Sequence, residues 1–376
     1  MRVLILMLVV ATLSGCSRNS FESFFSSGKG YLSSKKFPEA AIEFQNAARV
    51  NPESAEAQVG LGDAYSEMNQ PSAAAAAYRR ACTLDPLNIN ACVQAAAKFL
   101  ATGEFVAAVA AARTALAADE YSLDAQLLLG SALAGVRRFA EAEERLQAAL
   151  AQAPQDARPY KALGDLQRQR GNFRAAEVWL RHAVDRDPSS ADARISLAQL
   201  YLDTGRAGDG ERELRAAVVA EPSDLAANEL LASYLVATDR CDDAEPYWKE
   251  VARRSADGSG AIQLADFYVS RGRTDEALRV LREHSARDAN GAVSARVASI
   301  LYDRGDRAKA TDMVDKILEG HQSSVNALLL KARISLDDHD VAKAREYAHR
   351  AATLAPDAPA VRNMLAAATA ASGPTR

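Results

Sequence analysis

The sequence has few of the residues and motifs that mark an enzyme centre or a metal site. It has four cysteines and five histidines in 376 residues, and no HExxH or CxxC motif brings such side chains together. It also has no G-x-S-x-G nucleophile elbow and no glycine loop that would hold a phosphate. The sequence therefore predicts no catalytic residues, no enzyme activity, no metal, no cofactor and no small-molecule substrate.

Positive charge is not in excess either. Lysine and arginine number 45 against 49 aspartates and glutamates, for a formal net charge of −4. Proteins that hold nucleic acid show a basic excess and basic patches, so we expect no nucleic-acid partner. The chain is 48% hydrophobic, without strand-like alternation and without a linker that would divide it. These features favour one continuous all-helical array.

A small residue returns along the chain at an almost constant interval. The steps are 34 residues long, except for two 33-residue steps that end at Ala277 and Ala310. A second small-residue series lies twelve positions upstream, beginning with Gly28 and Gly62, and a proline series lies twelve positions downstream, beginning with Pro52 and Pro86. The first series reads Ala40, Ala74, Ala108, Ala142, Ala176, Gly210, Ala244, Ala277, Ala310 and Ala344. Two small-residue registers over ten units, with proline at its place in six of them, indicate internal repeats.

Each repeat reads as two short helices with a turn between them. Apolar residues recur at spacings of three and four on both sides of turn formers such as Asn69-Gln70-Pro71. The small residues at the Gly62 and Ala74 places would let the two helices approach closely. Such a pair has too little core to fold alone, so neighbouring pairs are expected to stack.

The small residue, tyrosine, alanine, aromatic residue, alanine and proline at this period resemble the tetratricopeptide repeat (TPR). The resemblance covers about residues 21–358. It implies an α-solenoid of about ten helix–turn–helix units that form a right-handed superhelix, with the inner surface lined by the first helix of each unit. Residues 359–371 read as a capping helix and residues 372–376 as a tail.

The N-terminus has the pattern of a lipoprotein signal. Arg2 precedes an apolar run that is too short to span a bilayer but suits a signal-peptide core, giving a signal peptide over residues 1–15. Leu13-Ser14-Gly15-Cys16 resembles the bacterial lipobox, which implies an acylated Cys16 and a short tether over residues 16–20. Ser17 resembles sorting patterns of the outer membrane. The alternative is a plain secretory signal with a chance cysteine. We expect a lipid-anchored protein of the cell envelope, at the outer membrane and facing the periplasm.

Two further cysteines, Cys82 and Cys92, flank the turn between repeats two and three. In an oxidising periplasm they could form a disulfide. We favour the alternative that both are small residues packed between helices. The distance between their Cα atoms decides, because beyond about 7 Å no bridge can form. Cys241 has no candidate partner in the sequence.

The inner groove implied by the resemblance is the expected binding surface for a protein or peptide. Repeats three and four supply an apolar strip to it and repeat five a charged patch. The Lys/Asn clamp of some TPR co-chaperones is absent, since Phe25 and Lys29 occupy its places, so an amphipathic helix or extended segment is the expected ligand. The alternative is that the apolar residues simply pack between helices. The predicted groove residues are Val93, Ala97, Leu100, Leu127, Ser131, Lys161, Asp165, Arg168, Ile195, Gln199 and Leu202.

These features together predict a membrane-tethered TPR scaffold that mediates protein–protein interactions in the bacterial envelope. The order of lipobox, short tether and repeats resembles lipoproteins of exopolysaccharide export and of exosortase (PEP-CTERM) surface-protein sorting. The alternatives are a pilotin or secretion assembly factor, and the specificity module of an envelope enzyme.

Overall fold

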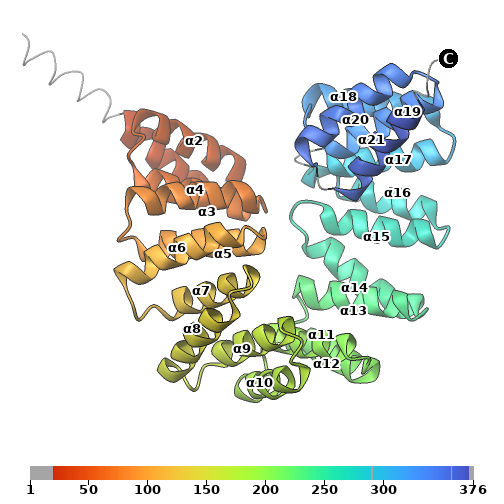
Figure 1. Cartoon of the computed structure of the whole chain (residues 1–376). Coiled ribbons are helices and arrows are strands. Elements are labelled where there is room, and N and C mark those ends of the chain that lie inside the picture. The colour runs from red at the N-terminus through yellow and green to blue at the C-terminus, as the bar shows by residue number, and fades with distance from the viewer. Residues whose placement is uncertain (1–19, 289–290, 357, 372–376) are drawn as a thin grey trace, which may run out of the picture. The chain divides into compact units, whose positions relative to one another are not determined.

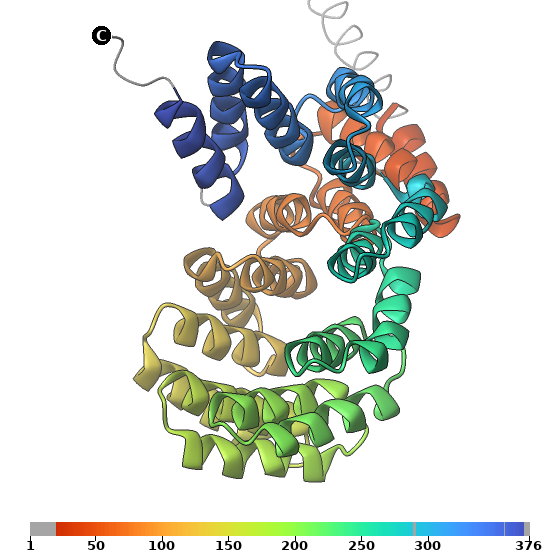
Figure 2. The ribbon, with the colours of Figure 1, turned by 90° about the vertical axis from the view of Figure 1, so that its right-hand side faces the viewer.

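The computed structural model describes residues 20–288, 291–356 and 358–371, and within these ranges all regular structure is helical (Figures 1 and 2). This confirms the predicted all-α solenoid of paired helices. The helices gather in two compact units, with the boundary between Pro222 and Ser223. We call them the N-terminal unit and the C-terminal unit.

The N-terminal unit contains six helix pairs. In each complete pair a first helix of 13 residues is followed by a second helix of 14, and this fixed length sets the 34-residue period. The first pair is the helix over residues 20–33 with α2 (Phe37–Val50). The others are α3 (Ala55–Glu67) with α4 (Pro71–Leu84), α5 (Ile89–Ala101) with α6 (Phe105–Ala118), α7 (Leu123–Gly135) with α8 (Phe139–Gln152), α9 (Ala157–Gln169) with α10 (Phe173–Arg186), and α11 (Ala191–Asp203) with α12 (Ala207–Ala220).

The C-terminal unit contains four pairs and a closing helix. They are α13 (Leu225–Ala237) with α14 (Cys241–Arg254), α15 (Ser259–Ser270) with α16 (Thr274–Glu283) and a 3₁₀ turn η1 (Ser285–Arg287), α17 (Ala292–Asp303) with α18 (Arg307–Gly320), and α19 (Val325–Asp337) with α20 (Val341–Leu354). The closing helix α21 (Pro359–Ala370) packs against α19 and α20. The two 33-residue steps have a local cause, because α15 and α17 each have 12 residues and follow a left-handed glycine, Gly258 or Gly291.

The first helices from α3 to α13 begin at polar side chains that cap them. The Ser54 hydroxyl accepts a hydrogen bond from the Ala57 backbone N–H at 3.1 Å, and the Asn88 side chain accepts from the Ala91 N–H at 3.0 Å. A cap of this kind stabilises a helix by about 1 kcal/mol. The full series of caps is Ser54, Asn88, Ser122, Asp156, Ser190 and Asp224.

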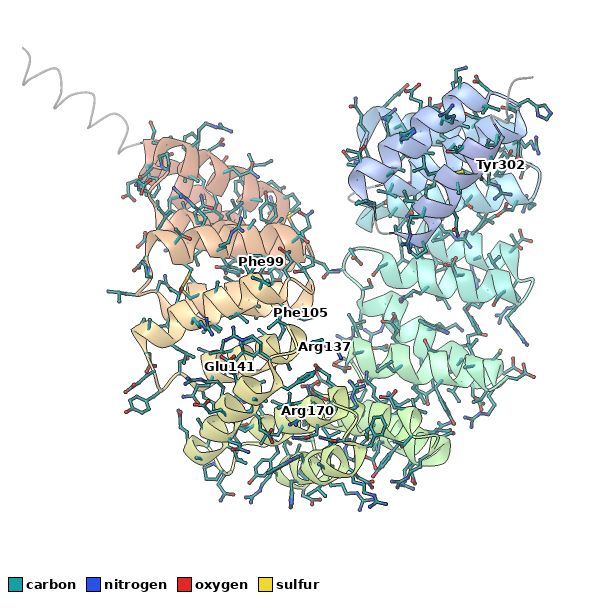
Figure 3. The ribbon with its side chains drawn as sticks, viewed as in Figure 1. Phe99, Phe105, Arg137, Glu141, Arg170 and Tyr302 are labelled. Atoms are coloured by element: carbon teal, nitrogen blue, oxygen red, sulfur yellow. A yellow bond between two sulfur atoms is a disulfide. The ribbon has the colours of Figure 1, made fainter. Side chains whose placement is uncertain are left out.

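Small residues let the two helices of a pair approach closely, as the sequence indicated. A Cβ atom at Gly62 would lie 2.7 Å from the ring of Tyr78, and a Cβ atom at Gly164 would lie 2.5 Å from Leu180 Cγ. Large side chains from the facing helix fill the space that each glycine leaves. Phe99 of α5 and Tyr302 of α17 are also buried (Figure 3).

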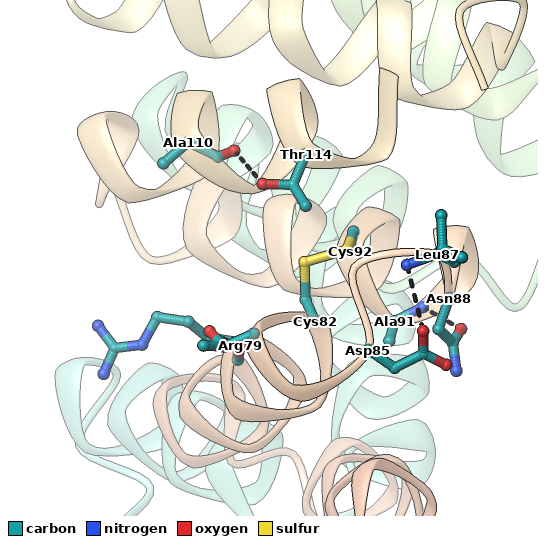
Figure 4. The surroundings of a disulfide bond; sticks show 10 residues. Arg79, Cys82, Asp85, Leu87, Asn88, Ala91, Cys92, Ala110 and Thr114 are labelled. Carbon is teal, nitrogen blue, oxygen red and sulfur yellow. Dashed lines mark hydrogen bonds between the residues drawn. A yellow bond between two sulfur atoms is a disulfide. The ribbon is translucent and has the colours of Figure 1, made fainter. Parts of the chain in front are cut away.

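A disulfide bond joins two neighbouring repeats. Cys82 in the last turn of α4 is bonded to Cys92 in the first turn of α5, and their Cα atoms are 4.8 Å apart (Figure 4). The preferred prediction, that these are two separate packing residues, is wrong. The loop over residues 85–88 is short enough to bring both helix ends together, with the two sulfur atoms facing each other in the buried junction. The Cys241 thiol is free at the start of α14.

Within the described ranges, no helix combines the length and the hydrophobicity needed to cross a bilayer. The predicted signal peptide and Cys16 lie outside the described residues.

Candidate functional site

The first helices of successive pairs lie side by side and form one continuous face in each unit. In the N-terminal unit α5 contacts α7, α7 contacts α9 and α9 contacts α11. In the C-terminal unit α15, α17, α19 and α21 follow one another in the same way. We call the outward side of these helices the first-helix face. The first helices of the N-terminal unit carry every groove residue that the sequence predicted.

The structure places the predicted groove residues on four helices of the N-terminal unit. Ile195 is only 8% exposed, so it offers little surface to a partner. The ten partly exposed residues are Val93, Ala97 and Leu100 on α5, Leu127 and Ser131 on α7, Lys161, Asp165 and Arg168 on α9, and Gln199 and Leu202 on α11. Their role in binding a partner remains a prediction.

Leu100 and Leu127 also support the fold. Both pack against a cluster of buried residues that includes Phe99, Leu129 and Leu133. A charged substitution at either position would place a carboxylate against this cluster and disturb the helix pair itself. These two leucines are therefore poor positions for a test of binding.

The cations of repeat five are held by acids of the neighbouring repeats. Arg158 Nη1 lies 2.6 Å from Asp124 Oδ1 on α7, and Arg168 Nη1 lies 2.9 Å from Asp203 Oδ2 of α11. Partners in these pairs are 34 or 35 residues apart, so they occupy nearly the same register in adjacent repeats. The charged patch is consequently a row of ion pairs between neighbouring helices. It offers a ligand less unpaired charge than the sequence suggests.

Lys161 lies at the centre of this row of ion pairs. Its Nζ atom is 3.1 Å from Asp165 Oδ2 and 3.0 Å from Asp192 Oδ2, so one ammonium group bridges α9 and α11. Burial by itself would lower the pKa of Lys161, but the two carboxylates outweigh burial and raise it. The side chain therefore stays protonated and joins the two helices.

Aspartates that recur one place after the small residue have structural partners. The Tyr78 hydroxyl donates to Asp63 Oδ1 at 2.7 Å, and burial of the phenol, with that neighbouring carboxylate, raises the pKa of Tyr78. On α15, Asp266 Oδ1 accepts from Arg296 Nε at 2.5 Å. These pairs link helices, and nothing in them assembles a nucleophile with a base.

The C-terminal unit has a hollow of about 450 Å³ on its first-helix face. We call it the C-terminal groove. Four helices, α15, α17, α19 and α21, contribute to it. Its lining residues are Ile262, Asp266, Ala295, Arg296, Ser299, Asn326, Leu329, Leu330, Arg333, Ala360 and Met364.

This groove has an apolar floor and charged margins. Ile262, Leu329 and Met364 are partly exposed apolar side chains on three different helices. Arg333 on α19 pairs with Asp303 at 2.8 Å, and its guanidinium lies 5.2 Å from the Tyr302 ring centroid. Aliphatic anchors beside fixed hydrogen-bonding groups are the surface that holds a peptide segment in a groove.

The repeat register also pointed to this groove, although the set of predicted groove residues did not include its lining. Ile262 and Leu329 follow Ile195 by 67 and 134 places, which are whole numbers of repeats. Asp266 and Arg333 follow Gln199 by the same intervals. The register that gives Ile195 also predicts Ile262 in repeat eight, and continuing it would have found the other three.

In the described ranges, no three histidine, cysteine, aspartate or glutamate side chains are grouped so that they could hold a metal ion.

Family models described as tetratricopeptide repeat match most of the chain. One matches residues 26–89 and 298–359, a second matches residues 99–166 and 167–234, and a third matches residues 261–293. The chain is a tetratricopeptide repeat protein. Proteins of this family bind peptides or proteins in the groove of the repeats, and they are generally non-catalytic scaffolds.

The chain is similar to several solved structures. A tetratricopeptide repeat protein of Parabacteroides merdae is 16% identical, with 70% of this chain and 98% of that chain covered and a TM-score of 0.52. A thermophilic TPR protein of Thermus thermophilus is 23% identical over 49% of this chain and 100% of its own, with a TM-score of 0.44. The PilF protein of Pseudomonas aeruginosa is 23% identical over 56% and 97%, with a TM-score of 0.40. No curated protein matches the chain.

Proposed function

We propose that this TPR protein is a membrane-tethered scaffold of the bacterial cell envelope that holds a protein partner in its C-terminal groove. The observation that carries the proposal is the groove itself. It lies on the first helices, has an apolar floor, and is bordered by Arg296 and Arg333. The protein acts by binding, without catalysis of its own.

The groove suits a peptide segment with two or three apolar anchors. Ile262, Leu329 and Met364 lie on three different helices, α15, α19 and α21, and offer contacts to alternate or i, i+4 side chains of a ligand. Asn326 and Arg333 at the margin supply hydrogen-bond donors that orient it. Affinity in such a groove comes from a few anchors, while the margin provides specificity.

Two features support a place outside the cytoplasm. A buried disulfide such as Cys82–Cys92 persists in oxidising compartments and is rare where thiols are kept reduced. The lipobox at Cys16 supports an anchor in the membrane, with the repeats starting close behind it. On the order of these elements we propose exopolysaccharide export or surface-protein sorting as the setting, at the outer membrane.

A photo-crosslinking amino acid at Asn326, on the groove margin, tests the binding face in intact cells. We expect one discrete protein adduct, which Arg333→Glu combined with Ile262→Ser abolishes. The same crosslinker at Arg345, an exposed position on α20, serves as the matched control and is expected to give no such adduct. An adduct at Asn326 that survives both groove substitutions would show that the partner binds elsewhere.

The anchor is tested separately. Cys16→Ala is expected to release the protein from the membrane fraction, because acylation at that thiol supplies the bilayer contact. Cys241→Ala, which removes a free thiol with no predicted lipid, should leave the protein in the membrane fraction. Retention of the Cys16→Ala variant contradicts the lipid anchor and leaves the groove proposal standing.

A further inference from the structure

The N-terminal unit has a second hollow, on its second helices and away from the first-helix face. It measures about 680 Å³ and lies between α4 and α6. Figure 4 shows Arg79 and Cys82 on the α4 wall and Ala110 and Thr114 on the α6 wall. We call this hollow the second-helix groove. Neither the fold nor the C-terminal groove requires it.

The α6 wall is apolar where an exposed helix is ordinarily polar. Its sequence, FVAAVAAARTALAA, has a single charged residue and no polar face. Val106 is 76% exposed, and Ala110 is exposed one turn further along. Scattered apolar residues are common on surfaces, but a surface helix without a polar face is unusual for a solvated position.

Phe105, at the start of α6, also lines the groove (Figure 3). Its ring lies against Gly135 of α7, where an added Cβ atom would come within 2.3 Å of Phe105 Cδ1. The ring is therefore held in place by the next repeat. Together with Val106 and the alanines it forms a rigid apolar floor that a helix can approach closely.

Two opposite charges border this floor. The Arg79 guanidinium lies 5.7 Å from the ring centroid of Phe99, and the Glu104 carboxylate accepts a hydrogen bond from the Thr102 hydroxyl at 3.1 Å. In the part of the chain that the structure describes, neither enters an ion pair. The neighbouring Arg80 and Arg113 by contrast are paired with Glu53 and Glu141.

We propose that a second copy of this chain docks on the second-helix groove through a two-fold axis. In a two-fold interface the same surface meets itself, so each Arg79 would face Glu104 of the other copy, and the pair would form twice. The floors of Val106 and Ala110 would cover each other between the two pairs. This self-association is independent of which partner occupies the C-terminal groove.

Charge complementarity favours a second copy over a uniformly acidic or uniformly basic helix. An acidic helix would satisfy Arg79 but repel Glu104, and a basic helix would do the reverse. A surface that bears one charge of each sign is neutralised in full by its own two-fold mate. The interface is apolar at its centre and charged at its margin, as protein interfaces generally are.

Disulfide capture in native membranes tests the proposal on the full chain. Ala110→Cys, in a Cys241→Ser background, places a thiol beside the proposed two-fold axis and is expected to give a covalent dimer on oxidation. Val178→Cys, on the exposed side of α10 and two repeats away, is the matched control and should give none. An Ala110→Cys chain that stays monomeric, or that captures a different protein, overturns the proposal.

Charge reversal provides a second test of the proposal. Arg79→Glu or Glu104→Arg alone sets like charges opposite each other and is expected to reduce the dimer adduct by about tenfold. The double variant restores opposite charges across the axis and should recover the adduct. Circular dichroism checks that each variant keeps its helicity. Single variants that crosslink as well as the parent, or a double variant that does not recover, refute the two-fold pairing.

Discussion

Breaking the Cys82–Cys92 bond should weaken the array at one junction by a predictable amount. The bond closes a loop between residues that are 10 apart in the sequence. A cross-link of that span removes loop-closure entropy from the unfolded chain worth roughly 3 kcal/mol at 25 °C. This is a substantial share of the 5–15 kcal/mol that typically separates folded from unfolded domains. We therefore expect a marked loss of stability on reduction or in Cys82→Ala combined with Cys92→Ala.

The loss should be local. In a repeat array each pair contacts mainly its neighbours, so a weakened junction uncouples the repeats on its N-terminal side from the rest. Hydrogen exchange should quicken in α2, α3 and α4, while α19 and α20 keep their protection. The ordinary packing of α4 on α5 remains, so these helices are expected to open more often without unfolding outright.

Urea unfolding followed by circular dichroism, with and without a reductant, measures the effect. Both cysteines fall in one tryptic peptide, residues 81–98, so its mass reports the bond through the loss of two hydrogens. Cys241→Ala is the control for losing a thiol without a cross-link. An unchanged midpoint in protein whose peptide mass shows full reduction would refute the entropic reasoning. A peptide that never lacks the two hydrogens would refute the bond.

Two other substitutions test the packing and the charge network. Gly164→Ala should destabilise the N-terminal unit by about 1–3 kcal/mol in urea unfolding, because the new methyl meets Leu180, whereas Gly208→Ala on α12 meets no atom within 4 Å and should be neutral or stabilising. If Gly208→Ala were destabilising, it would contradict the expectation that alanine stabilises a helix where its methyl group has room. Glu245→Gln should lower the thermal midpoint of the C-terminal unit, since the Arg273 guanidinium donates to that carboxylate at 2.6 Å. The hydrogen bond from Arg273 lowers the pKa of Glu245 to about 2, so its contribution is present above the ordinary pKa near 4.5 and is lost as the pH falls toward 2. An acid titration that is identical in parent and variant would contradict this linkage.

The paired helices could be predicted from the sequence because small residues recur where the two helices of a pair approach closely. Gly62 and Gly164 occupy the repeated place and lie against the side chains that a larger residue would displace. In the sequence, the two 33-residue steps appear only as a spacing one residue shorter than the others. Their cause is a first helix that is one residue shorter and follows Gly258 or Gly291, and it depends on left-handed backbone geometry that the period does not encode.

The contents of the candidate site were harder to predict. The register places Lys161 on the first-helix face, but its two acidic partners on α9 and α11 follow from side-chain reach, which a spacing rule leaves undetermined. The disulfide was the less favoured alternative for a similar reason. Cys82 and Cys92 belong to different repeats, and only the short loop between α4 and α5 turns them toward each other.

The same bond has a mechanical consequence. A pulling force that enters the array through its first residues and leaves through a later repeat must cross from α4 to α5. Between Cys82 and Cys92 the load is carried by a covalent sulfur bridge, and the residues between them are shielded from tension. Stretching can straighten the chain on either side of that point, but the intervening loop contributes no length.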